Sequence, residues 1–322
     1  MLMKNDFRAL LQEEAGMIAA TRHMSKEGQG SIAALVRFET MAFHKPIFVG
    51  EVASCNCEII FTSKQSILVE VVVTAEDITK GKTRVTNTGW LWYVPFEKNK
   101  DWKVSQVPPM PTPEGDEAAM KKYEKAKAHY ETRKERDDNA AEGTDAKETT
   151  NASGLDAFKN QYATPSEGRT PSESEQVLAQ IVLPGDCGKD KVAFGGFVMK
   201  LMDNAAGCSA WKHCRTNIVT VAISDLDFVS WVRLGDLCTI AGKVIFVSSK
   251  SLEIEVVASV ATLSGEDNKV ARGLFTFVSI GSDGSVHSVP NLKLESEEDM
   301  RNAYLGQQRY EAAKRARLEG KK

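Results

Sequence analysis

Residues 194–207 read FGGFVMKLMDNAAG, and the organisation of the chain is clearest when it is followed outward from this stretch. The pattern predicts a helix that begins at a glycine pair, because apolar side chains then occupy most positions around its axis. Such a helix is expected to be buried on nearly all sides. The remaining positions recur at spacings of three and four and therefore share one narrow face: Lys200, Asp203, Asn204 and Gly207.

Asp203 has two interpretations on such a helix. Charged side chains usually avoid burial, so the carboxylate is expected on a solvent-facing stripe beside Lys200. The alternative is that Asp203 faces a pocket and acts as a base or a nucleophile. Gly195 and Gly196 give the alternative some support, because glycines at a helix start let a ligand approach the free backbone N–H groups.

The composition is that of a globular protein. The chain has 322 residues, 42% hydrophobic and 26% charged, which is enough for two domains of ordinary size. A formal net charge of -3 gives no general argument for nucleic acid or an anionic membrane as a partner. We expect no membrane span and no signal peptide, and a cytoplasmic location. The cysteines lack zinc-type spacing and are expected to be reduced thiols: Cys55, Cys57, Cys187, Cys208, Cys214 and Cys238.

Both halves of the chain predict the same order of elements. In the first half a helix is followed by four strands and a charged helix, over residues 5–24, 32–38, 50–61, 66–73, 84–94 and 116–136. In the second half a helix turn or strand at 174–183 precedes the glycine-pair helix, and then strands and a charged helix follow over 217–228, 235–246, 251–260, 272–280 and 295–317. We therefore expect domains at 1–136 and 174–322, joined by a flexible linker at 137–173.

An internal repeat supports this division. FHKPIFVGE at residues 43–51 matches FVSWVRLGD at residues 228–236, and the same offset aligns Phe61 with Phe246. EEAGMIAATRHM at residues 13–24 aligns without gaps on DNAAGCSAWKHC, which begins at Asp203. A repeat of this length indicates a duplicated domain and not a solenoid unit.

The first copy is shorter than the second at its beginning. In the helix register Met1 lies opposite Lys191, so nothing matches the strand and loop that open the second copy. Asn5 and Asp6 stand where the second copy has its glycine pair. We therefore expect an N-terminally truncated first domain with an unpaired strand edge.

The repeat also places other side chains in matched positions. Glu13 lies opposite Asp203 but lacks a glycine pair, so we expect a surface glutamate without an active site of its own. His23 and His213 end the two long helices, where a histidine caps helix carbonyls. Trp90 and Trp92 share one strand face and are expected in the core or at a subunit interface.

One helix wrapped by an antiparallel sheet, with a glycine pair and an acid, resembles the hotdog fold. VTVAISDLDF at residues 219–228 and FVSSKSLEIEV at residues 246–256 are similar to strands of hotdog acyl-CoA thioesterases. With LWYVP at residues 91–95 and the tandem order, the chain resembles the brain-type cytosolic long-chain acyl-CoA hydrolases, which have two hotdog domains. The resemblance implies an α+β fold of two tandem hotdog domains. It also implies hydrolysis of fatty acyl-CoA to free fatty acid and CoA without a cofactor or metal, in a homo-oligomer of paired hotdog units.

Residue by residue, the resemblance implies that Asp203 is the catalytic aspartate and that Gly195-Gly196 is the glycine pair of the family. Phe194 departs from the family, which usually has histidine there. The family's asparagine in the first opening loop has no counterpart, and Val192 occupies the equivalent place in the second copy. In our hypothesis Asp203 activates water or attacks directly, and the Gly196 N–H polarises the thioester carbonyl.

Four further residues are candidates for substrate binding. Ser249, Lys250 and Ser251 could hold CoA phosphates, although an ordinary polar turn between two strands has the same composition. Thr220 could line a channel for the pantetheine arm or could simply favour a strand. Ser-His-Asp order and a nucleophile-elbow motif are both missing, which argues against an α/β-hydrolase.

Because half of the family's catalytic pair is missing, a non-catalytic acyl-CoA-binding or assembly subunit is the alternative function. Such a subunit would retain affinity for CoA but release no free thiol. A hotdog dehydratase is a weaker third option, since the histidine that it needs is not found at Phe194.

Overall fold

The computed structural model describes residues 5–24, 31–97, 103–141, 152–188, 190–262, 264–265, 267–281 and 283–319. The first half contains α1 (Asn5–Met24), β1 (Ser31–Phe43), β2 (Val52–Thr62), β3 (Ile67–Asp77), β4 (Lys82–Glu97), β5 (Lys103–Val104) and α2 (Glu117–Ala141). The second half begins with α3 (Ala152–Gln161), α4 (Pro171–Ser174), β6 (Gln176–Ile181), η2 (Pro184–Asp186) and α5 (Gly195–Cys214). It continues with β7 (Asn217–Phe228), β8 (Leu237–Val247), β9 (Ser251–Ala261), β10 (Asp267–Ile280) and α6 (Glu297–Glu319). Every helix and strand predicted by periodicity is present.

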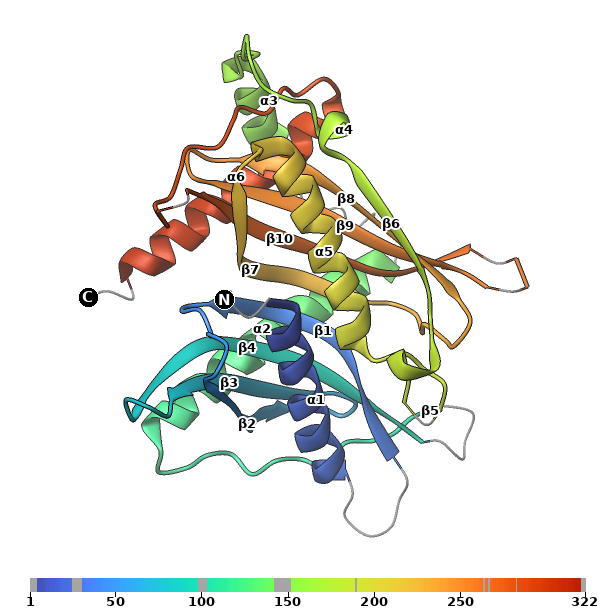
Figure 1. Cartoon of the computed structure of the whole chain (residues 1–322). Coiled ribbons are helices and arrows are strands. Elements are labelled where there is room, and N and C mark those ends of the chain that lie inside the picture. Colours follow the sequence, from blue (N-terminus) through green and yellow to red (C-terminus); the bar gives the residue numbers. More distant parts are fainter. Residues whose placement is uncertain are drawn as a thin grey trace.

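The two halves share one sheet. Its strand order is β2-β3-β4-β1-β7-β10-β9-β8-β6, with β5 paired to β4 (Figure 1). β1 and β7 join the halves as an antiparallel pair, in which Arg37 lies opposite Asp227 and Ala42 opposite Ala222. The repeat aligns Arg37 with Ala222 and Ala42 with Asp227, so each of these two pairs is the counterpart of the other. The halves are therefore related by an approximate twofold axis between β1 and β7.

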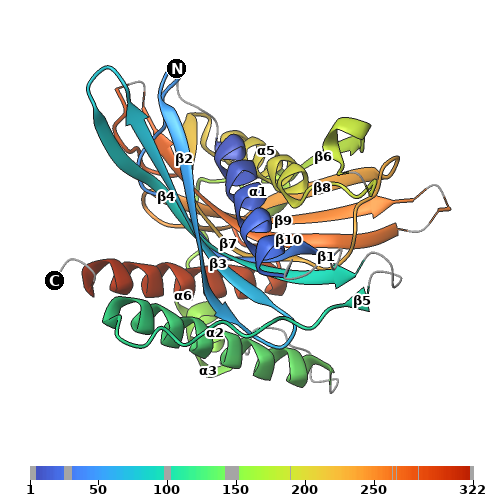
Figure 2. The ribbon, with the colours of Figure 1, turned by 90° about the horizontal axis from the view of Figure 1, so that it is seen from below.

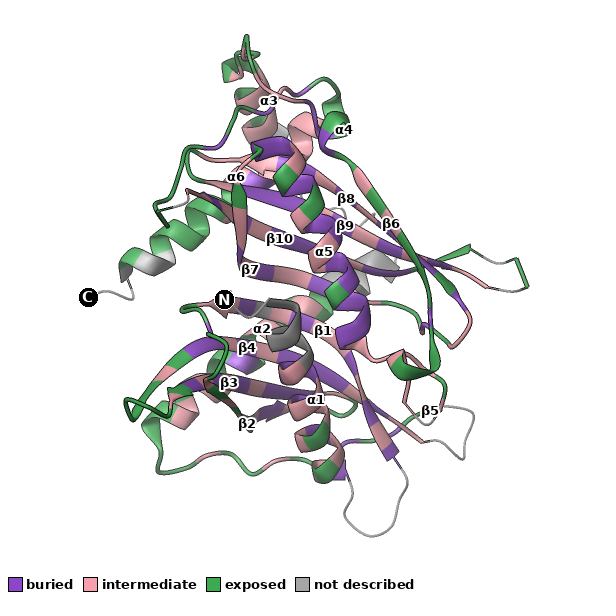
Figure 3. Ribbon diagram, in the orientation of Figure 1, coloured by how far each residue is buried: buried purple, intermediate pink, exposed green. Residues whose placement is uncertain are grey.

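Each half wraps its sheet around one long helix. α1 and α5 contact each other on one face of the sheet, while α2, α3 and α6 lie on the opposite side (Figure 2). Most apolar positions of α5 are buried against the sheet, whereas the last turns of α6 are exposed (Figure 3). This arrangement confirms the predicted tandem hotdog architecture, in which the helix with little polar surface lies inside the curved sheet.

The histidines at the ends of the two long helices do not cap their own helices. His23 Nε2 lies 2.8 Å from the Pro108 carbonyl oxygen, and His213 Nε2 lies 3.0 Å from the Pro290 carbonyl oxygen. Both prolines follow the last strands of their halves. The capping prediction was therefore wrong, and each histidine instead ties its helix to the segment that leaves the sheet.

The two tryptophans of β4 belong to the layer beneath α2. Trp92 is 1% exposed, and its indole N–H donates to Glu39 Oε2 at 2.9 Å. The Trp90 indole N–H donates to Glu70 Oε1 at 3.1 Å. The Tyr130 ring of α2 lies 5.9 Å from the Trp92 ring, so the prediction of a core position is confirmed.

The predicted linker contains a folded segment. Residues 142–151 lie outside the described part, but residues 152–161 form α3, where a flexible chain was expected. The Phe158 ring lies 5.8 Å from the Tyr304 ring of α6, and the Tyr162 hydroxyl donates to the Leu292 carbonyl at 3.0 Å. Two aromatic residues in an otherwise polar segment are enough to dock it.

The two outer edges of the sheet differ. β6 pairs with β8 along the second half. Among the described residues no strand pairs with the outer edge of β2, which is the strand equivalent to β8. This is the edge that the repeat predicts to be unpaired.

Candidate active site

Two pockets lie at equivalent positions in the two halves. The Asp203 pocket, of about 1210 Å³, is lined by the polar face of α5, by β7 and by residues 43–48 after β1. The Glu13 pocket, of about 340 Å³, is lined by α1, by β1 and by the equivalent residues 228–232 after β7. Each pocket is therefore built from both halves of the chain.

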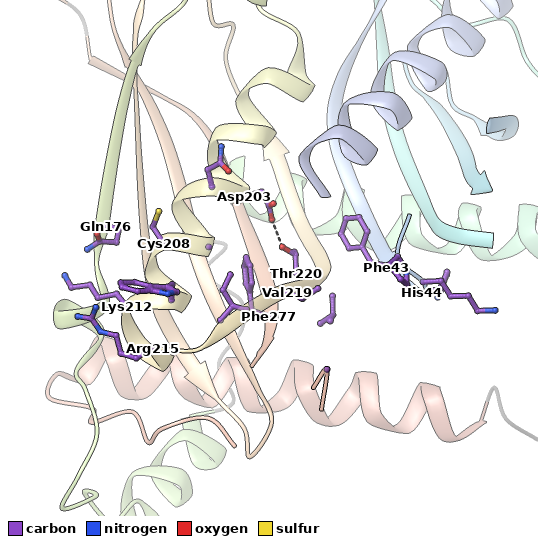
Figure 4. Close-up of a pocket in the computed structure, with 18 of the residues that line it drawn as sticks. Phe43, His44, Gln176, Asp203, Cys208, Lys212, Arg215, Val219, Thr220 and Phe277 are labelled. Atoms are coloured by element: carbon purple, nitrogen blue, oxygen red, sulfur yellow. Dashed lines mark hydrogen bonds between the residues drawn. The ribbon is translucent and has the colours of Figure 1, made fainter. Parts of the chain in front are cut away.

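Asp203 faces its pocket and not open solvent. Asn204 and Gly207, the next residues of the same helix face, line the pocket with it. The side chain of Asp203 is half-buried, and Figure 4 shows it pointing toward β7. The polar stripe read from the sequence is therefore the wall of a pocket.

Thr220 orients the Asp203 carboxylate. The threonine is 4% exposed, and its hydroxyl donates to Asp203 Oδ1 at 2.8 Å (Figure 4). A hydroxyl donor on a carboxylate stabilises the ionised form and limits its rotation. Thr220 therefore does more than favour a strand.

Basic side chains line this pocket. Lys212 and Arg215 lie at one end of the lining, at the C-terminal end of α5, while His44 and Lys45 come from the other half (Figure 4). The Arg215 guanidinium lies 4.7 Å from the ring of Trp211, which is 51% exposed. The arrangement combines positive charge with an exposed aromatic ring, which suits a polyanionic ligand that also carries an aromatic nucleobase.

The glycine pair does not belong to the Asp203 pocket. Gly196 lies two turns before Asp203, about 10 Å along the helix axis. Its backbone N–H donates instead to the carboxylate of Glu13, and Gly195 lines the Glu13 pocket. The structure therefore does not bring Gly196 and Asp203 together in one pocket as we predicted.

Glu13 is not a surface glutamate, so that prediction was wrong. Its side chain is 2% exposed. Burial raises the pKa of the Glu13 carboxyl from 4.5 to about 7, with a smaller increase from Glu14 and an opposing effect of the Gly196 N–H. The repeat had aligned Glu13 with Asp203, and this alignment was the signal that pointed to a second buried acid.

The predicted phosphate-binding residues lie elsewhere. Ser249 and Lys250 lie in the turn between β8 and β9, and Ser251 begins β9. The Ser248 hydroxyl oxygen accepts from the Ser251 N–H at 3.0 Å. Ser249 lines a separate pocket of about 420 Å³ beside α6. The structure places them away from Asp203, and their contacts are those of an ordinary polar turn.

Phe194 and Val192, the two departures from the family pattern, both line the Glu13 pocket. Val192 forms a backbone bridge with Arg233, and Phe194 precedes the first turn of α5. Within the described ranges, no group of three or more His, Cys, Asp or Glu side chains is arranged to hold a metal ion. None of the helices in those ranges combines the length and hydropathy that a membrane span requires.

Comparison with known proteins agrees with the tandem fold. The thioesterase superfamily model matches residues 9–82 and 190–262, one match in each half. The fold and these two matches define a tandem hotdog protein of the thioesterase superfamily.

Individual relatives identify the family within the thioesterase superfamily. The chain is 37% identical over 305 residues to the cytosolic acyl coenzyme A thioester hydrolase of Homo sapiens, covering 92% of this chain and 75% of that protein. The enzyme of the same name from Rattus norvegicus matches to the same extent. An acyl-CoA hydrolase structure from Staphylococcus aureus with butyryl coenzyme A is 26% identical, with a TM-score of 0.44, over 47% of this chain and 93% of that chain. The chain belongs to the family of cytosolic acyl-CoA thioester hydrolases.

Proposed function

We propose that this chain hydrolyses fatty acyl-CoA to free fatty acid and CoA in the Asp203 pocket, using water and no metal or other cofactor. The observation that carries the proposal is the hydrogen-bonded pair of Asp203 and Thr220 in a large pocket that is also lined by basic residues. The names of the relatives support the same reaction class.

Asp203 is the base in this proposal. Its carboxylate takes a proton from water as the oxygen attacks the thioester carbonyl carbon, and the C–S bond then breaks to release CoA as a thiolate. The Thr220 hydroxyl keeps the carboxylate in one orientation during this step. Direct attack by Asp203 would instead pass through an acyl anhydride, which water must then hydrolyse.

The donors for the developing oxyanion follow from the repeat. Gly196 N–H, in the first turn of α5, reaches the acid of the other half. By the same approximate twofold, we expect the backbone of the first turn of α1, which begins at Asn5, to be the equivalent donor near Asp203. Backbone N–H groups at a helix start carry partial positive charge and are free to donate.

The pocket has separate surfaces for the two ends of the substrate. Phe43, Ile218 and Phe277 provide apolar walls for the acyl chain. Lys212 and Arg215 provide positive charge for the CoA phosphates. We expect the thioester to lie between them, next to Asp203.

Location and assembly also belong to the proposal. The relatives are named cytosolic, which supports the cytosol as the compartment of this chain. A related solved structure is described as a hexameric acyl-CoA thioesterase. We expect this chain to form a homo-oligomer of paired hotdog units and to bind neither nucleic acid nor a membrane.

The test is release of free CoA thiol from palmitoyl-CoA by the purified full chain. Asp203→Asn should abolish most of the release, while Asp156→Asn, an exposed aspartate on α3, should leave it unchanged. Equal release by the wild type and Asp203→Asn would refute the role of Asp203. Retained CoA binding without any thiol release would favour the non-catalytic alternative.

A further inference from the structure

The Glu13 pocket has the size and lining of a small-molecule site. Its volume is about 340 Å³, within the range of known ligand pockets. Most of its wall is apolar, from Ile32 and Leu35 on β1, Val198 on α5 and Trp231 after β7. None of the described residues that line it is Lys or Arg.

One polar atom in this pocket has no protein partner. The Glu13 carboxylate accepts a hydrogen bond from the Gly196 N–H, but its Oε2 is buried without a hydrogen-bond partner among the described residues. A buried carboxylate oxygen without a partner is costly, and such atoms in native structures call for an explanation. Because Glu13 lines the pocket, a ligand there could supply the missing partner.

The groups around Glu13 determine which ligand fits. On α1, Glu14 disfavours a second negative charge. From β4, the Tyr93 hydroxyl donates to the Glu13 main-chain oxygen at 2.8 Å, and burial, with smaller effects of Glu13 and of Cys57 on β2, raises the pKa of Tyr93. Asp190 lies on the pocket wall. These neighbours and burial favour the protonated form of Glu13, which holds a proton that it can donate to an acceptor.

The start of α5 determines the sign of the charge that a ligand in this pocket can carry. The helix runs over twenty residues from Gly195, and its first N–H groups point toward this pocket. The positive end of a helix dipole stabilises one negative charge and disfavours a cation. The Glu13 carboxyl and a carboxylate of the ligand that share one proton would together carry that single negative charge.

We propose that the Glu13 pocket binds the carboxylate group of a fatty acid together with one proton, and that it does not hydrolyse thioesters. The proton lies between Glu13 Oε2 and a carboxylate oxygen of the ligand, and the apolar wall holds the chain. Leu35 occupies the position equivalent to Thr220, so the hydroxyl that orients the acid in the Asp203 pocket has no counterpart here. That the bound fatty acid is a product of this chain's own reaction rests on the proposed hydrolysis, whereas the binding of a fatty acid itself does not.

The experiment is calorimetric titration of the full chain with sodium decanoate at pH 6, 7 and 8, in two buffers of different ionisation enthalpy. We expect uptake of about 0.9 proton per bound ligand at pH 8 and about 0.1 at pH 6. The affinity should fall about tenfold per pH unit above pH 7, because the free ligand is ionised throughout. Uptake independent of pH would overturn the proposal.

Four variants locate the site. Glu13→Gln should remove the proton uptake and the pH dependence, whereas Glu14→Gln should retain both. Ala34→Phe fills the Glu13 pocket and should abolish proton-linked binding while thiol release continues. Val219→Phe fills the equivalent position of the Asp203 pocket and should leave proton-linked binding intact.

The outcomes separate the two proposals. Proton-linked binding that persists in both Glu13→Gln and Ala34→Phe would place it elsewhere and refute the site. Binding of decylamine that tightens above pH 7 and is lost in Glu13→Gln would show a cation site instead. A chain that releases no thiol from palmitoyl-CoA but binds decanoate with a proton would refute the proposed hydrolysis alone. If Ala34→Phe does not fold, the loss or retention of proton uptake in Glu13→Gln decides the question.

Discussion

The Asp203 pocket and the Glu13 pocket occupy equivalent positions in the two halves, yet they differ in almost every polar contact. Asp203 is half-buried and accepts a hydroxyl hydrogen bond from Thr220. Glu13 is fully buried, accepts a backbone hydrogen bond from Gly196, and has Leu35 where the other pocket has Thr220. The duplicated fold has kept an acid at both places, while the burial and the hydrogen-bond donors around the two acids differ.

The difference shows that the position of an acid in a fold does not decide its chemistry. A general base must be ionised and reachable by water. Asp203 is half-buried in a pocket of about 1210 Å³ and accepts a hydroxyl hydrogen bond from Thr220, whereas burial raises the pKa of Glu13 to about 7 in an apolar pocket. We therefore propose the reaction for the Asp203 pocket and ligand binding for the Glu13 pocket.

The largest expected effect is on catalysis. Asp203→Asn should lower the rate of thiol release by about 100- to 10,000-fold, the contribution typical of a positioned base. Glu13→Gln at the equivalent position should leave the rate within about twofold. Thiol release from palmitoyl-CoA at saturating substrate measures both variants, and comparable losses in the two would mean that the pockets act together.

The next effect is on stability and has a defined dependence on pH. The pKa of Glu13 in the folded chain is about 7, above the 4.5 of an ordinary glutamate, so ionisation costs the folded state free energy. The contribution of Glu13 to the free energy of unfolding is therefore at its full value below pH 4.5. It is lost as the pH rises through 7 and stays lower at higher pH. Glu13→Gln should therefore raise the free energy of unfolding at pH 8 by about 3 kcal/mol.

Urea unfolding at pH 4, 6 and 8 tests this prediction. The advantage of Glu13→Gln over the wild type should be small at pH 4 and should increase at each higher pH. Glu14→Gln, on the next residue of the helix, should show no such increase. An advantage that is the same at all three pH values would be incompatible with an acid that titrates near pH 7 in the folded state.

A smaller effect concerns the orientation of the catalytic acid. Thr220→Val removes the hydroxyl bonded to Asp203 and should lower kcat about tenfold, corresponding to about 1.4 kcal/mol. Leu35→Thr introduces a hydroxyl at the equivalent position, and we expect it to create no second hydrolytic site. Steady-state kinetics of Thr220→Val measures the first effect, and the double variant Asp203→Asn with Leu35→Thr measures the second. An unchanged kcat in Thr220→Val would remove the positioning role.

The smallest effect concerns CoA binding. Lys212→Ala should raise KM for palmitoyl-CoA about two- to fivefold at low salt and less at high salt, because exposed charges are screened. Lys250→Ala, in the turn between β8 and β9, is the matched control and should not change KM. A larger effect of Lys250→Ala than of Lys212→Ala would restore the phosphate site predicted in that turn.

Local sequence was a good guide to the elements of this protein. The helix over residues 5–24 and the strand over residues 217–228 have the predicted ends, and the repeat predicted a duplicated domain, which the family resemblance identified as a hotdog unit. α3 was missed because its segment is mostly polar. Its docking depends on Phe158 and Tyr162, which contact residues far along the chain.

The sequence by itself determined the two long helices, the strands around them and the pairing of Glu13 with Asp203 in the repeat, because hydrophobic periodicity is a property of neighbouring residues. Only the tertiary structure decided that β1 and β7 join the halves in one sheet and that Gly196 faces Glu13 and not Asp203. The physical reason is that burial and hydrogen bonding at these places depend on how one half packs on the other. Acids at matched positions of the repeat can therefore end in a small apolar pocket in one half and in a larger pocket lined by Lys212 and Arg215 in the other.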